Sequence, residues 1–92
     1  MTITVQYSAQ LRVAAGVTSE NVAVEDGCTL RQLAARLAER HGQAFRELLL
    51  ASDGNPRPSN IALVREQMVR WNETRALRDG DVVAFLSPIA GG

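Results

Sequence analysis

Apolar and polar residues alternate at the start of the chain. The stretch TITVQY (Thr2–Tyr7) places an apolar side chain at every second position from Ile3 onward. This period of two predicts a strand with one buried face. Residues 8–21 contain Gly, Ser, Thr and Asn and predict a turn. Residues 20–26 then predict a returning strand, so the chain is expected to open with a hairpin.

The clearest predicted element is a helix over Leu30–His41. Thr29 precedes it as a good N-cap, and Gln32 stands three residues later as the partner in a capping box. Gly42 supplies a C-terminal stop. The apolar residues that share one helical face are Leu30, Leu33, Ala34 and Leu37.

The second half of the chain reads as a short helix, a loop and several strands. Residues 44–50 predict a second helical segment, and residues 51–60, which contain Pro and Gly, predict a surface loop. Strands are predicted at residues 60–66, 67–71 and 81–87. The last of them is apolar on both faces, which predicts a central strand that is covered on both sides.

This order of elements predicts the fold class. One amphipathic helix has one sheet to cover, and the first and last strands are the most apolar, so they are expected side by side at its centre. The long intervening chain provides the crossover that parallel neighbours need. We therefore expect an α+β, β-grasp (ubiquitin-like) fold with a mixed sheet of about five strands on one main helix. Residues 1–92 are expected to form a single domain with an extended tail at 87–92.

Composition narrows the class of function. Ten basic residues balance ten acidic ones in 92 residues, which argues against a general nucleic-acid binder. No basic run, signal pattern or long apolar run marks a membrane protein, so a cytoplasmic protein is expected. Every basic residue is Arg, so no lysine is present for Schiff-base chemistry, general-base catalysis or isopeptide formation.

The candidate catalytic residues favour structural roles. Cys28 and His41 are too few for a usual zinc site. Cys28 is interpreted as a partly buried filler rather than a reactive thiol, and His41 as a residue that suits a helix C-terminus. Asp79 and Asp81 suit a turn better than acid–base catalysis, and Trp71 suits packing on an edge strand. The chain is therefore expected not to be an enzyme by itself and to bind no cofactor stably.

The ending SPIAGG (residues 87–92) carries the functional hypothesis. Ordering Gly on docking is entropically costly, so a functional Gly-Gly must be favoured for another reason. Without Cβ atoms, Gly91 and Gly92 can thread a narrow channel and present a terminal carboxylate to a partner's buried active site. Pro88 presets an extended backbone, and Ile89 offers an apolar anchor. The carboxylate of Gly92 is then the reactive group.

Two motifs give the chain a family resemblance. The ending LRDGDVVAFLSPIAGG resembles that of the small, sulfur-carrier subunit of molybdopterin synthase (MoaD-type), in the MoaD/ThiS ubiquitin-like sulfur-carrier family. The opening QYSAQLRVAAG is also similar to that family's opening. The chain departs from the family pattern at Val13, where a Glu is usual, at Leu86, where an aromatic is common, and at Ser87, where a proline is usual.

The resemblance implies a cycle with two partners. An adenylyltransferase similar to ubiquitin-activating enzymes would use ATP to adenylate Gly92, and sulfur transfer would give a thiocarboxylate. The tail would then enter the large synthase subunit, in a heterotetramer, and donate sulfur to the pterin precursor. The residues expected to contact these partners are Pro88, Ile89, Ala90, Gly91 and whichever of Phe85 and Leu86 faces outward.

Other readings stay open at the level of sequence. Related β-grasp carriers that end in Gly-Gly serve thiamine, cysteine and tRNA-thiolation pathways. A ubiquitin-like modifier attached to lysines of other proteins is a further alternative, as is an interaction domain with an incidental tail.

Overall fold

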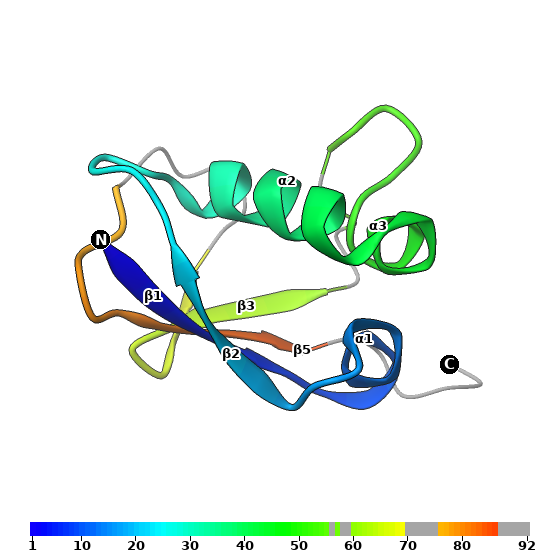
Figure 1. The fold of residues 1–92 in the computed structure, drawn as a ribbon, viewed down its shortest axis with the longest axis horizontal. Coiled ribbons are helices and arrows are strands. Elements are labelled where there is room, and N and C mark those ends of the chain that lie inside the picture. The colour runs from blue at the N-terminus through cyan, green and yellow to red at the C-terminus, as the bar shows by residue number, and fades with distance from the viewer. Residues whose placement is uncertain (56, 58–59, 70–75, 87–92) are drawn as a thin grey trace.

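The structure is a computed structural model that describes all residues except 56, 58–59, 70–75 and 87–92. Figure 1 shows the arrangement of its elements. In chain order they are β1 (Thr2–Tyr7), α1 (Ala9–Ala15), β2 (Ser19–Ala23), α2 (Leu30–His41), α3 (Gln43–Leu49), β3 (Ile61–Val64), β4 (Gln67–Val69) and β5 (Val82–Leu86).

The described strands form one five-stranded sheet in the order β2-β1-β5-β3-β4. The first and last strands, β1 and β5, are parallel neighbours at its centre, as the sequence predicts. The other neighbouring strands pair antiparallel, so the sheet is mixed. Helix α2 lies across one face of the sheet (Figure 1), which gives the expected β-grasp, ubiquitin-like fold.

The core lies between the sheet and the helices on that one face. Val5 of β1 and Phe85 of β5 are fully buried, as are Leu33 and Leu37 of α2 and Phe45 of α3. Because side chains alternate along a strand, the neighbours of the buried residues point to the opposite face, which is called the outer face below.

The prediction that β5 is covered on both sides is wrong. Val83 and Phe85 are fully buried, but Val82 is 38% exposed and Ala84 and Leu86 are partly exposed. The physical reason is that the described helices pack on one face of the sheet only. The apolar residues on the outer face therefore remain in contact with solvent.

Local sequence signals explain α2. The Thr29 side chain accepts a hydrogen bond from the Gln32 backbone N–H, and the Gln32 side chain accepts one from the Thr29 N–H. This is the predicted capping box, which satisfies two amides at the start of the helix. At the other end, Gly42 has a φ of 92° and ends the helix where predicted.

The structure corrects the interpretation of residues 8–21, which the sequence predicts as a turn. Ala9–Ala15 forms helix α1, and Gly16 ends it in the left-handed region, with a φ of 79°. The helix forms because Leu11 is fully buried, while Ala14 and Ala15 pack against the core. The order of elements therefore contains one helix more than predicted, inside the first hairpin.

Strands β3 and β4 form an antiparallel hairpin with a tight turn, and β3 ends at Val64 rather than at the predicted residue 66. Arg65 and Glu66 form its two-residue turn, with positive φ angles of 53° and 68°. Two central residues with positive φ are typical of a type I′ turn, which matches the twist of the strands but normally uses Asn or Gly. The predicted strand 67–71 runs on into residues outside the described ones, and Trp71 is among these.

Replacing Glu66 by Gly should stabilise the fold. The substitution removes a Cβ atom from the left-handed region, and this outweighs the entropy that Gly loses, for a net gain of about 0.5 kcal/mol. Thermal or urea unfolding measures the change. The control is Glu39→Gly at an exposed position of α2, which should cost about 1 kcal/mol. A loss of stability in both variants would show that the turn is not strained.

Candidate functional site

The root of the tail is the end of β5. Tyr7 of β1 pairs with Phe85, and the Ser8 hydroxyl donates a hydrogen bond of 3.4 Å to the Phe85 carbonyl. Leu86 is the last residue of β5. The predicted site residues Pro88, Ile89, Ala90, Gly91 and Gly92 all lie outside the described residues.

The sequence left open which of Phe85 and Leu86 faces outward, and their burial decides it. Phe85 is fully buried on the side of α2 and α3 and belongs to the core. The expectation that Phe85 contacts partners is therefore corrected, because this side chain is not accessible. Leu86 is partly exposed and lies on the outer face, beside Ile61 in the strand pairing.

An apolar patch covers the outer face next to this root. Cross-strand partners share a face, and the pairings Ile61–Leu86, Leu63–Ala84 and Leu63–Met68 bring their side chains together. Met68 is 71% exposed, Ile61 39% and Val82 38%. The residues of this outer-face patch are Ile61, Leu63, Met68, Val82, Ala84 and Leu86.

A shallow groove of about 320 Å³ lies beside the patch at the end of β1. Apolar side chains of β5 line one side, and polar residues of β1 and of the turn before β2 line the other. Its lining residues are Gln6, Tyr7, Ser8, Thr18, Ser19, Ala84 and Leu86. The groove makes the surface around the tail root partly polar.

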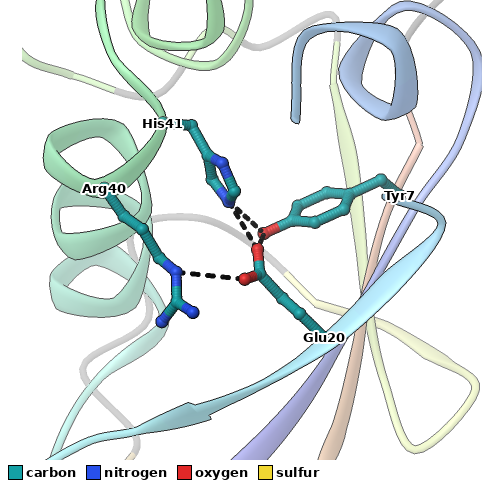
Figure 2. A network of polar contacts seen from close by, with 4 residues as sticks. All are labelled: Tyr7, Glu20, Arg40 and His41. Atoms are coloured by element: carbon teal, nitrogen blue, oxygen red, sulfur yellow. Dashed lines mark hydrogen bonds and ion pairs between the residues drawn. The ribbon is translucent and has the colours of Figure 1, made fainter. Parts of the chain in front are cut away.

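A polar cluster occupies the core side of the sheet at this end (Figure 2). The Tyr7 hydroxyl donates a hydrogen bond of 2.6 Å to Glu20 Oε2, and His41 Nε2 lies 2.5 Å from the same oxygen. Arg40 Nε is 3.1 Å from Glu20 Oε1. The ring of His41 also packs on Phe45, with centroids 4.9 Å apart. The cluster links β1, β2, α2 and α3.

The protonation of this cluster follows from its contacts. Burial alone would raise the pKa of the Glu20 carboxyl, but the hydrogen bonds from Tyr7 and His41 and the charges of His41 and Arg40 outweigh it and lower that pKa. Burial, and then the hydrogen bond to Glu20, raise the pKa of Tyr7 above its usual value. Glu20 is therefore an ionised carboxylate that accepts hydrogen bonds from its neighbours.

The two aspartates near β5 have structural roles, as the sequence predicts. Asp79 Oδ1 accepts a hydrogen bond of 2.8 Å from the Thr2 N–H. Buried Asp81 accepts one of 2.8 Å from the Arg78 N–H and one of 2.6 Å from Arg65 Nε. These bonds tie the start of β5 to the start of β1 and to the β3–β4 hairpin.

The remaining candidates add no reactive group to the described part of the chain. Cys28 is buried, and burial raises the pKa of its thiol, which agrees with its interpretation as a filler. Sequence reasoning placed His41 correctly at a helix C-terminus but missed its contact with Glu20. Among the described residues no group of three or more His, Cys, Asp or Glu could hold a metal ion, and no helix is long and apolar enough to span a bilayer.

Comparisons with known proteins agree with this architecture. Over 92 residues the chain is 33% identical to the molybdopterin synthase sulfur carrier subunit of Chlamydomonas reinhardtii, covering 100% of both chains. The crystal structure of SAMP1 from Haloferax volcanii is similar with a TM-score of 0.88 and 22% identity, again over 100% of both chains.

A second similar structure is the complex of subunits 1 and 2 of molybdopterin-converting factor from Helicobacter pylori, with a TM-score of 0.62, 22% identity and 100% coverage of both chains. At this level of identity the two structures establish the fold. Residues 5–92 match the ThiS family. The chain therefore belongs to the ThiS/MoaD family of ubiquitin-like β-grasp sulfur carriers.

Proposed function

We propose that this protein carries sulfur as a thiocarboxylate on Gly92 and donates it in molybdopterin biosynthesis. The observation that carries the proposal is the match to a molybdopterin synthase sulfur carrier subunit over 92 residues, at 33% identity. The family match also runs through Gly91 and Gly92, so it includes the residues that would react.

The chemistry needs two steps at one carbonyl. First, the Gly92 carboxylate attacks the α-phosphate of ATP, which gives an acyl adenylate and releases pyrophosphate. Second, the terminal sulfur of a persulfide attacks the carbonyl carbon and AMP leaves, which gives an acyl disulfide; a thiol then cleaves its S–S bond and is itself oxidised to a disulfide. The product is a thiocarboxylate, and sulfur donation followed by hydrolysis restores the carboxylate. The side chains of the carrier take no part in these steps.

Two partners would supply the catalytic groups. An adenylyltransferase similar to ubiquitin-activating enzymes would perform the first step, and a large synthase subunit would receive the sulfur in a heterotetramer. The relative from Chlamydomonas reinhardtii is named as a subunit of a synthase, which supports a second chain. Because both partners need the same tail, they would bind the carrier in turn.

The outer-face patch is the surface that we assign to both partners. It is apolar, it includes Leu86 at the root of the tail, and Met68 within it is 71% exposed. An exposed apolar patch suits a protein interface, because burial on docking releases its water. Leu86 and the residues from Pro88 to Gly92 would then form one continuous contact.

Incubation with a cognate adenylyltransferase, ATP and a sulfur donor should replace one oxygen of the protein by sulfur. Intact-mass spectrometry of the full chain measures this change. An unchanged mass under conditions that convert a known carrier would contradict the proposal. A lysine adduct on other proteins would instead support a modifier, and conversion without transfer to a pterin precursor would indicate another sulfur pathway.

Deletion of Gly92 should abolish the mass change and leave the melting temperature within about 1 °C, because a glycine has no side chain to contribute to the apolar core. The matched control is the full chain with Ser52→Ala, a change at an exposed position of the loop after α3. That variant should still be converted. A large loss of stability on deletion would show that the tail serves the fold instead.

Substitution Met68→Asp should weaken binding of the adenylyltransferase by about tenfold or more, because docking would bury an unpaired charge. Val13→Asp is the matched control, since Val13 is 77% exposed on α1 and lies outside the patch. The apparent KM for the carrier in an ATP–pyrophosphate exchange assay measures both. Equal effects of the two substitutions would argue against the outer-face patch as the interface.

A further inference from the structure

The polar cluster lies where the tail begins. Tyr7, the last residue of β1, pairs with Phe85, and Leu86 follows. Glu20 belongs to β2, which pairs with β1 in the register Val5–Glu20. Figure 1 shows that α2 ends over the same end of the sheet as β5. The Glu20 carboxylate therefore connects three elements that surround the tail root.

Glu20 is partly buried and contacts three side chains, unlike a simple surface ion pair. The side chains of Glu20 and His41 are each only 12% exposed. One carboxylate oxygen accepts from Tyr7 and His41, and the other contacts Arg40. A buried ion pair is weak evidence for stability, because replacing the whole pair by apolar residues is often neutral or stabilising. An alternative role for such a charge is to hold one defined geometry.

The rings around the carboxylate restrict its partners. Tyr7 meets Phe45 edge to face, with centroids 5.4 Å apart, and meets His41 in the same way at 5.8 Å. These ring contacts help to hold the Tyr7 hydroxyl toward Glu20, and the Tyr7 backbone pairs with Phe85. Tyr7 therefore links Glu20 to the end of β5.

A second buried carboxylate holds the opposite end of β5. Asp81 is 5% exposed, directly precedes the strand, and bonds to Arg65 Nε at 2.6 Å. Asp81 thus acts at the start of β5, whereas Glu20 acts through Tyr7 at the end of the β1–β5 pair, where the tail begins. Substitutions of Asp81 and Glu20 can therefore be compared to separate an effect on stability from an effect on the end of β5.

We propose that Glu20 is a positioning residue. Through Tyr7 it holds the end of the β1–β5 pair in place, up to Leu86, the last residue of β5. This inference rests on the proposed function, because an ordered end of β5 matters for transfer only if a partner's active site must receive the residues that follow it.

The test compares Glu20→Gln with Asp81→Asn, each of which removes one buried charge with little change of shape. For Glu20→Gln, the rate of thiocarboxylate formation at saturating carrier should fall by about fivefold or more, because a less ordered end of β5 brings the residues that follow it into the reactive geometry less often. The KM for the carrier should stay unchanged, because the outer-face patch is intact. For Asp81→Asn, the rate of thiocarboxylate formation and the KM for the carrier should both stay near the wild-type values, even if stability falls as much as it does in Glu20→Gln.

The inference would be overturned if Glu20→Gln and Asp81→Asn slowed thiocarboxylate formation equally at the same loss of melting temperature. An unchanged rate for Glu20→Gln would also overturn it. Tyr7→Phe keeps the ring and removes the hydroxyl, so it serves if Glu20→Gln fails to fold. Tyr7→Phe should also lower the rate of thiocarboxylate formation, and a wild-type rate would again overturn the proposal.

Amide hydrogen exchange gives a readout that needs no partner. Glu20→Gln should speed exchange at Ser8 and Leu86 by about tenfold, as local opening becomes easier, while Asp81→Asn should not. If the wild-type chain is never thiocarboxylated, the proposed function fails but this measurement still decides whether Glu20 orders the tail root. Unchanged exchange at both residues would overturn the inference.

Acid unfolding tests whether the cluster forms in solution. Because contacts lower the pKa of Glu20, its contribution to stability is present above the unfolded glutamate pKa of about 4.3 and is lost as the pH falls through the lowered folded value. The wild type should therefore be more stable than Glu20→Gln at neutral pH, with a difference that shrinks below about pH 4. A difference independent of pH would contradict the cluster.

Discussion

The parallel pairing of β1 with β5 is the constraint on which the rest of the structure depends. Parallel neighbours cannot be joined by a tight turn, so the whole chain between Tyr7 and Val82 has to cross over and return. The crossover supplies α2 and α3, which cover one face of the pair. The parallel pairing also defines the two ends of the sheet. Thr4 pairs with Val82 at one end, and Tyr7 pairs with Phe85 at the other. The tail root is thereby placed far from Met1.

One-sided covering explains the binding surface that we propose. A chain of 92 residues has little material for a second layer, and its described helices pack on one face of the sheet. The outer face of β3 and β5 nevertheless carries Ile61, Leu63 and Val82 rather than polar residues. An apolar outer face is a cost to a monomer in water, so docking of a partner is the best physical reason for it.

The sequence was most informative where structure is set locally. The capping box of Thr29 and Gln32 and the stop at Gly42 fix the bounds of α2, so that helix was predicted from residue to residue. Helix α1 escaped prediction because its seven residues show less than two turns of periodicity, with Leu11 as the buried anchor. The polar cluster escaped for another reason: Glu20 and His41 lie 21 residues apart and meet only where α2 packs over the β1–β2 pair.

At the tail root, too, the sequence indicates local structure but not which contacts form between distant residues. Apolar residues on both faces of β5 indicate burial, but they do not tell whether the protein's own helices or a partner will cover each face. Because side chains alternate with a period of two, a slip of one residue in β5 would exchange the places of Phe85 and Leu86. The register is set by the pairing of β5 with β1 and β3 and is supported at its end by the Ser8–Phe85 hydrogen bond. The identity of the residue offered to partners therefore depends on polar contacts outside the apolar surface itself.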